Sequence, residues 1–152
     1  MSLESVQAFL DEKAPDIAII VTRESTATVA EAAAAHGVEP GQIAKTLSIR
    51  IGDRVVLLVT AGTARLDNRK ARAVFGGKVK MLPVEDVLAV TGHPVGGVCP
   101  FGLPTPLPVF CDESLRAFAE VIPAAGATNA ALRISPLRMA EITGAQWVDV
   151  CQ

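Results

Sequence analysis

Hydrophobic and polar residues repeat with two different periods along the chain. Apolar residues at helical spacing over 3–10 predict an N-terminal helix. Alternation over 43–51 predicts a strand, and Gly52-Asp53 is a two-residue turn signal before a return strand over 54–60. The pattern therefore indicates an early β-hairpin in a chain that also forms helices.

Capping and breaking residues mark the remaining elements. Thr28 and Glu31 form a capping box before an alanine-rich helix that ends at Gly37. The pattern predicts further helices over 67–75, 84–91, 112–119 and 135–144, and strands over 17–21, 78–82, 120–123, 131–134 and 147–150. Helices and strands intermix without a repeat or linker, which favours a single domain over residues 1–152 with a mixed sheet.

Composition narrows the possible functions. Half of the 152 residues are apolar and the net charge is −2, which argues against a protein that coats nucleic acid through bulk charge. The three cysteines form no CxxC pair, as expected for reduced thiols in a cytoplasm. The acidic N-terminus is not a signal peptide, and the longest aliphatic runs are far shorter than a membrane span. We expect a cytoplasmic protein without a membrane partner.

The segment GHPVGGVCPFG, residues 92–102, is the most unusual stretch of the chain. Gly96-Gly97 allows a ligand to touch the backbone, and Pro94 and Pro100 stiffen the flanks. Such a loop can present backbone N–H groups to a reacting centre, as an oxyanion hole does. The alternative is an ordinary turn between two elements.

Lys45 is in phase with the apolar row of its strand. It can lie at the core edge with its ammonium in water, or it can hold a charge at the rim of an apolar pocket. In the glycine-rich segment, Cys99 and His93 suggest a Cys–His nucleophile, although no third orienting group is evident. We consider it more plausible that Cys99 is a small apolar side chain lining a pocket.

Two further groups have both structural and functional interpretations. The segment RLDNRKARAVFGGKVK is rich in basic residues and is either a solvated helix face or a phosphate-binding patch. Gly126, Thr128 and Asn129 form either a turn or part of a site. Metal-binding and paired-carboxylate patterns are missing from the sequence, so we expect no metal and no cofactor.

Taken together, these motifs resemble the YbaK/prolyl-tRNA-synthetase-associated editing domain family. The resemblance rests on AKTL at residues 44–47, the basic helix after Leu66-Asp67, the GGVCPFG segment and the turn that leads into LRISP at residues 132–136. It covers nearly the whole chain in the expected order. It implies an α+β fold whose mixed, mostly antiparallel sheet curls toward a barrel surrounded by helices.

The resemblance also implies a function, which is hydrolysis in trans of the ester that joins a wrong, small amino acid such as alanine or cysteine to tRNA. The expected partners are the acceptor end of mischarged tRNA, foremost tRNA(Pro), and prolyl-tRNA synthetase, whereas DNA is not expected. The residues assigned to catalysis are Lys45, Gly96 and Gly97. Those assigned to the substrate are Thr46, Val98, Cys99, Pro100, Gly126, Thr128 and Asn129. Those assigned to tRNA are Arg65, Arg69, Lys70 and Arg72.

Two other functions remain open from the sequence. The first is a non-catalytic module that binds tRNA or a synthetase, in which Lys45 would have no chemical role. The second is a thiol-dependent hydrolase that uses Cys99. An aminoacyl ester is already activated, so the editing hypothesis needs only a positioned water or substrate hydroxyl and a cradle for the oxyanion.

Overall fold

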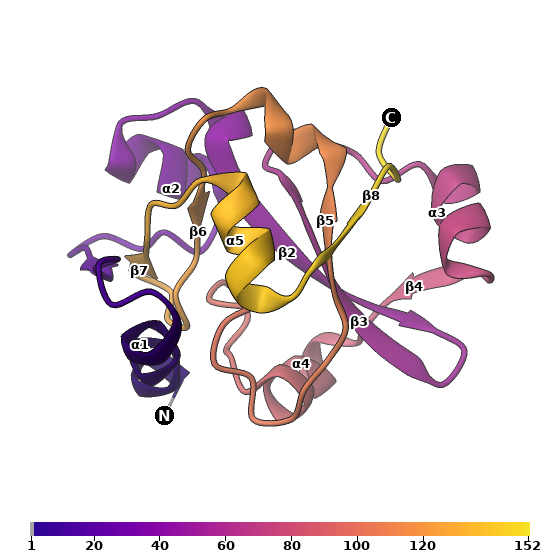
Figure 1. Cartoon of the computed structure of the whole chain (residues 1–152), viewed down its shortest axis with the longest axis horizontal. Helices are drawn as coiled ribbons and strands as arrows, with labels where there is room; N and C mark the ends of the chain where they lie inside the picture. Colours follow the sequence, from indigo (N-terminus) through magenta and orange to yellow (C-terminus); the bar gives the residue numbers. More distant parts are fainter. Residues whose placement is uncertain (1) are drawn as a thin grey trace.

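The computed structural model describes residues 2–152 and arranges them as a mixed sheet with helices on both faces (Figure 1). The helices are α1 (Ser2–Lys13), α2 (Val29–His36), α3 (Asn68–Phe75), α4 (Val84–Thr91) and α5 (Pro136–Thr143), with short 3-10 helices at Pro40–Gln42 and Glu113–Ala117. The strands are β1 (Ile20–Val21), β2 (Ile43–Ile51), β3 (Arg54–Ala61), β4 (Val79–Met81), β5 (Val109–Asp112), β6 (Ile122–Pro123), β7 (Ala130–Ala131) and β8 (Gln146–Val148).

The β2–β3 hairpin is the centre of the main sheet, whose strand order is β4-β2-β3-β5-β8. The hairpin is antiparallel, as predicted, and Gly52 takes the positive φ of +60° that its tight turn requires. β4 is also antiparallel to β2, whereas β5, β6 and β8 join by parallel pairings. The mixed α+β fold is confirmed, and within residues 2–152 no pairing joins β4 to β8, so the sheet stays open.

Local capping signals set the helix ends. Thr28 accepts a hydrogen bond from the N–H of Glu31, whose side chain reaches back to the N–H of Thr28, so the predicted capping box is confirmed. The Asp67 side chain caps α3 by accepting hydrogen bonds from the N–H groups of Arg69 and Lys70. The Ser135 side chain caps α5 in the same way. These signals act over three or four residues, which is why the sequence predicts them well.

Several predicted elements are shorter than expected, and three of them differ most in length or type. The strand over 17–21 is reduced to Ile20–Val21, and Val21 is 58% exposed because this strand pairs only with the two-residue β7. The strand over 131–134 is reduced to β7 and a single bridge between Val121 and Ile134. The helix over 112–119 is a 3-10 helix over Glu113–Ala117. For the two strands, the number of available backbone partners, rather than the local pattern, fixes the length.

The two faces of the main sheet support different parts of the molecule. Leu57 and Val59 point into the main core, which also contains buried residues of α1 and α5. Val56 and Leu58 point to the other face and pack with Ala71 of α3. Figure 1 shows α3 and α4 on opposite sides of the hairpin. None of the helices within residues 2–152 is both long and apolar enough to cross a membrane.

Candidate functional site

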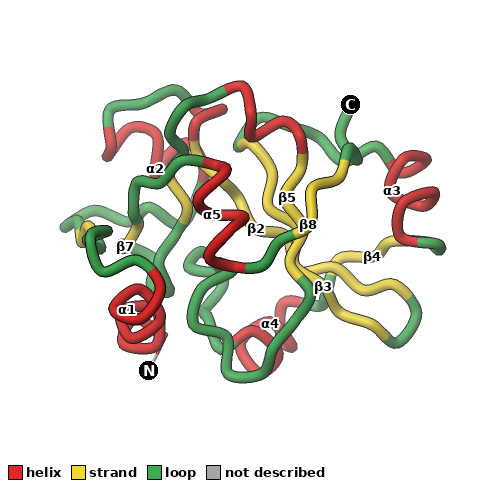
Figure 2. The backbone as a smooth tube through the Cα atoms, viewed as in Figure 1, coloured by secondary structure: helices red, strands yellow, loops and turns green. Residues whose placement is uncertain are grey.

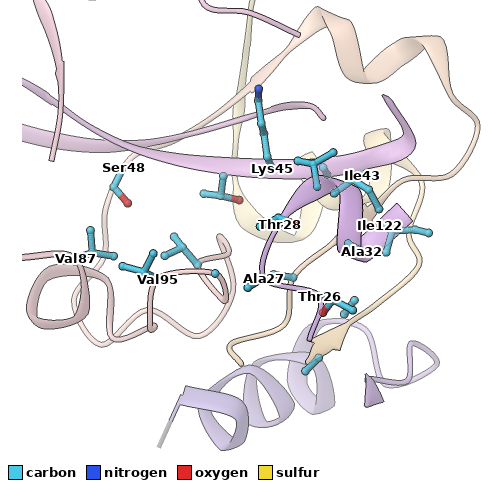
Figure 3. Close-up of a pocket in the computed structure, with 18 of the residues that line it drawn as sticks. Thr26, Ala27, Thr28, Ala32, Ile43, Lys45, Ser48, Val87, Val95 and Ile122 are labelled. Carbon is cyan, nitrogen blue, oxygen red and sulfur yellow. The ribbon is translucent and has the colours of Figure 1, made fainter. Parts of the chain in front are cut away.

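A cavity of about 270 Å³ lies beside a gap in the edge of β2 (Figure 3). β6 pairs with Ile43 and Ala44, and β4 pairs with residues 49–51, so residues 45–47 have no strand partner on that edge. The loop from α4 to β5, which Figure 2 shows as a long irregular segment, closes one side. Segment 26–29 and the short strands β6 and β7 close the other.

The lining of the cavity is apolar with a few hydroxyl groups. Alanine and valine predominate, and Thr26, Thr28, Thr46 and Ser48 add hydroxyl groups. Lys45 is the one ionisable residue in this lining, which contains no cysteine, histidine or carboxylate among the described residues. The cavity can therefore enclose a small apolar group, but its walls offer no nucleophile and no acid–base pair.

Thr46 has the most unusual polar group of the site. Its Oγ1 atom is buried and has no hydrogen-bond partner among the described residues, although the residue lines the cavity. A buried hydroxyl without a partner is costly and uncommon in folded proteins. Such a group is a candidate for contact with a ligand.

Lys45 lines the cavity, but its ammonium points away from it. Figure 3 shows the nitrogen on the opposite side of β2 from Ser48 and Val95. The Nζ atom donates a hydrogen bond of 2.7 Å to the carbonyl of Ala64. Desolvation lowers the pKa of Lys45, and the nearby Cys151 partly counters this effect. A contact between Lys45 and a bound ester would require the side chain to leave Ala64.

The glycine-rich loop supplies backbone to the cavity through Gly96 and Val98, and Gly97 supports it from behind. The N–H of Gly97 donates a hydrogen bond to the carbonyl of Pro94, and the carbonyl of Gly97 accepts one from the N–H of Gly126. Both backbone groups of Gly97 are therefore engaged. By contrast, the N–H groups of Gly96 and Val98 have no hydrogen-bond partner among the described residues. The loop therefore has two N–H groups without a partner at residues that line the cavity, Gly96 and Val98, whereas Gly97 is engaged on both sides and does not line it.

The Gly126 turn lies behind this loop rather than in the cavity wall. A Cβ atom on Gly97 would come within 2.7 Å of the backbone nitrogen of Ala127. The carbonyl of Thr128 accepts from the N–H of Thr26 at 2.7 Å, and the Asn129 amide donates to the carbonyl of Thr22 at 3.0 Å. Gly126, Thr128 and Asn129 therefore hold segment 22–26 and the loop together, and they lie outside the cavity lining.

Cys99 and Pro100 are buried away from the cavity, which corrects the expectation that they line it. The Cys99 thiol lies 3.5 Å from Nε2 of His93, and that nitrogen also lies 2.7 Å from the carbonyl oxygen of Phe101. Burial raises the pKa of Cys99 to about 12, against a smaller opposite effect of the Phe101 carbonyl contact. An inaccessible, protonated thiol is not a nucleophile, so the geometry disfavours a thiol-dependent hydrolase.

The basic residues that the sequence assigned to tRNA are exposed, but they lie on the α3 side of the sheet. Arg69, Lys70 and Arg72 belong to α3, and Arg65 precedes it. Lys70 is partly neutralised, because its Nζ lies 3.2 Å from a carboxylate oxygen of Asp149. The structure does not bring these cations to the cavity.

Sequence reasoning missed several parts of the site. Thr26, Thr28 and Ser48 line the cavity, and so does Val87 of α4. Ser48 shares a strand face with Thr46, so alternation along β2 contained a signal for it. Segment 26–28 and α4 carried no such signal, because they reach the cavity only through the tertiary fold. Among residues 2–152, no group of three or more His, Cys, Asp or Glu side chains is arranged to hold a metal ion.

Comparison with known proteins identifies the family of the chain. The model of the aminoacyl-tRNA editing domain family matches residues 23–142, and the chain belongs to this family. It is 43% identical over 154 residues to the uncharacterized protein YwhH of Bacillus subtilis. This alignment covers 100% of this chain and 98% of YwhH. It is 31% identical over 117 residues to EbsC of Enterococcus faecalis, named "Putative Cys-tRNA(Pro)/Cys-tRNA(Cys) deacylase", over 75% of this chain and 71% of EbsC.

A solved structure shows the same fold. It is described as "a putative trans-editing enzyme for prolyl tRNA synthetase" and superposes with a TM-score of 0.92 at 36% identity, over 99% of this chain and 97% of that one. The family resemblance deduced from the sequence is thereby confirmed. At the level of the family, the domain acts on aminoacyl-tRNA.

Proposed function

We propose that the protein is a trans-acting hydrolase that removes a small amino acid, such as alanine or cysteine, from mischarged tRNA, with tRNA(Pro) as its main substrate. The observation that carries the proposal is the small apolar cavity beside free backbone N–H groups in an editing-domain fold. The names of EbsC and of the solved relative support the choice of tRNA(Pro).

The chemistry follows from what the cavity contains. Because its lining offers no cysteine, histidine or carboxylate, a water has to attack the ester carbon, and a hydroxyl of the substrate can orient that water. The bond between the acyl carbon and the ribose oxygen breaks, and this oxygen takes up the proton that the water loses. The N–H groups of Gly96 and Val98 would stabilise the negative charge that develops on the carbonyl oxygen. Lys45 would leave Ala64 and add its positive charge to this oxygen or to the terminal phosphate.

The size of the cavity sets the selectivity. At about 270 Å³ it lies below the roughly 300–1,000 Å³ of sites that enclose drug-sized ligands. An aminoacyl group fits inside, and the terminal nucleotide stays outside. A synthetase distinguishes a missing methylene by only about 1–3 kcal/mol, so a second, smaller pocket that admits the wrong amino acid increases accuracy.

The deciding experiment measures deacylation of tRNA(Pro) charged in turn with alanine, cysteine, serine, 2-aminobutyrate and proline. We expect rapid loss of one small amino acid and retention of proline. Lys45→Ala should reduce the rate by roughly 100-fold, the size expected for the loss of one oxyanion-stabilising group. Lys45→Arg, which keeps the charge, is the matched variant, and circular dichroism verifies that both variants fold.

The alternative is a module that binds tRNA without reacting. It would predict that all five aminoacyl-tRNAs stay charged while tRNA still binds. It would also predict that Lys45→Ala binds tRNA as well as the unmodified protein does. That combined result would exclude the hydrolase and favour the binding module.

A further inference from the structure

A basic groove of about 710 Å³ lies between the β2–β3 turn and the turn that follows α3. We define the basic groove by the side chains of Arg50, Arg54, Lys78 and Lys80, which are all exposed. The lining includes no acidic residue among the described residues. In a chain of net charge −2, this local excess of positive charge is a distinct feature.

The cations of the basic groove are not neutralised within the protein. None of the four forms an ion pair within residues 2–152. Arg54 donates a hydrogen bond to the carbonyl of Phe75 at 3.3 Å, which fixes its place beside α3. The charges of Arg50, Lys78 and Lys80 are therefore available to an external anion.

Arg50 and Lys80 stand directly opposite each other in the β2–β4 ladder. Like charges at such positions repel each other and weaken the sheet. Lysine on the edge strand β4 could serve to prevent edge-to-edge aggregation. That explanation does not extend to Arg50, because β2 is an inner strand. Because the Arg50–Lys80 pair weakens the sheet, its presence suggests that these two cations bind a ligand of opposite charge.

Two cations of the basic groove, Arg50 and Lys80, belong to the cavity side of the sheet, whereas Arg54 lies opposite Ile51 on the α3 side. Thr46, Ser48 and Arg50 alternate onto one face of β2, and the first two line the cavity. Arg50 is therefore about 7 Å beyond Ser48 along the strand. The predicted tRNA-binding residues of α3 belong to the opposite face, because Ala71 of α3 lies in the same buried cluster as Ile49 and Ile51 of β2.

We propose that Arg50, Lys78 and Lys80 bind the phosphates of the RNA strand whose aminoacylated 3′ end enters the cavity. This inference rests on the proposed function for the position of the 3′ end. In the proposed function the cavity holds the aminoacyl group, so the nucleotides that precede the 3′ end lie outside the cavity and cross the same face. Each basic side chain neutralises about one phosphate and releases its counterion, which gives affinity that does not depend on base sequence.

The test compares two double variants that lose the same charge on opposite faces. Arg50→Gln/Lys80→Gln alters the basic groove, and Arg69→Gln/Arg72→Gln alters α3. The probe is a fluorescently labelled, deacylated tRNA(Pro) transcript, and anisotropy gives the dissociation constant over a series of sodium chloride concentrations. Because this RNA carries no ester, the binding result is independent of whether the protein hydrolyses anything.

We expect the groove variant to bind about 10- to 30-fold more weakly at about 0.15 M salt. The slope of log K against log salt should fall by about 2, one unit for each lost contact. The α3 variant should bind as the unmodified protein does. The melting temperature of the groove variant should stay the same or rise, since a repulsion has been removed.

Three results would overturn the proposal. The first is an equal or greater loss of affinity in the α3 variant. The second is failure of the unmodified protein to bind this RNA at low salt. The third is a fall in the melting temperature of the groove variant, which would show that Arg50 and Lys80 serve the fold.

Discussion

Replacing Thr46 by valine should stabilise the protein and impair its function at the same time. Valine has nearly the shape of threonine and is equally suited to a strand. The buried Oγ1 of Thr46 has no partner among the described residues, so removing it breaks no hydrogen bond. Thr91→Val is the matched control, because that buried hydroxyl donates to the carbonyl of Val87 at 2.8 Å and accepts from the N–H of His93 at 3.1 Å.

The expected magnitudes follow from these contacts. An unsatisfied buried polar group costs about 1–3 kcal/mol, so Thr46→Val should raise the free energy of unfolding by about 1 kcal/mol. For a chain of this length, the melting temperature should rise by about 2–4 °C. Thr91→Val should lower the free energy of unfolding by about 1–3 kcal/mol, because it leaves a buried N–H without its partner. If the Thr46 hydroxyl meets the substrate, deacylation should slow by about 2- to 10-fold.

The assay combines urea unfolding with deacylation of mischarged tRNA(Pro) for both variants. Opposite signs of the two stability changes would support the interpretation of Thr46 as a group kept for the ligand. A loss of stability in Thr46→Val similar to that in Thr91→Val would refute it, since the hydroxyl would then have a partner in the folded protein. An unchanged deacylation rate would show that the hydroxyl does not serve the substrate.

Three further predictions concern Cys99, Gly97 and Asp112. Cys99→Ala should retain most of the deacylation rate, because burial raises the pKa of the Cys99 thiol to about 12 and keeps it protonated at neutral pH. A complete loss of activity in a folded variant would restore the thiol mechanism. Gly97→Ala should lower the urea midpoint by an amount equivalent to about 2 kcal/mol or more, because the new Cβ meets the backbone of Ala127, and an unchanged midpoint would contradict the packing. Burial raises the pKa of Asp112, but hydrogen bonds led by the one from the N–H of Val150 outweigh it and lower the pKa overall. The contribution of Asp112 to the free energy of unfolding should therefore be complete above about pH 4 to 5 and should decline as the pH falls through its lower folded-state pKa. In acid unfolding, the stability of Asp112→Asn should not show this pH-dependent decline.

The sequence by itself determined the elements whose signals are local. The hairpin of β2 and β3, the capping box at Thr28, the cap at Asp67 and the bounds of α4 all follow from residues within a few positions of one another. Turn geometry and capping hydrogen bonds do not depend on distant parts of the chain. The order of the AKTL and GGVCPFG motifs was likewise enough to indicate the family.

Only the tertiary structure decided which residues share a site. The cavity forms where β6 ends and β4 begins on one edge of β2, and strand pairing between distant segments cannot be deduced from periodicity. The sequence placed Lys45 correctly on its strand, but the hydrogen bond to Ala64 directs its ammonium to the far side. Cys99 is close to Gly97 in sequence, yet it enters the core while Gly96 and Val98 meet the cavity. The reason is physical: backbone pattern fixes the face on which a side chain lies, whereas packing against distant segments fixes what it contacts.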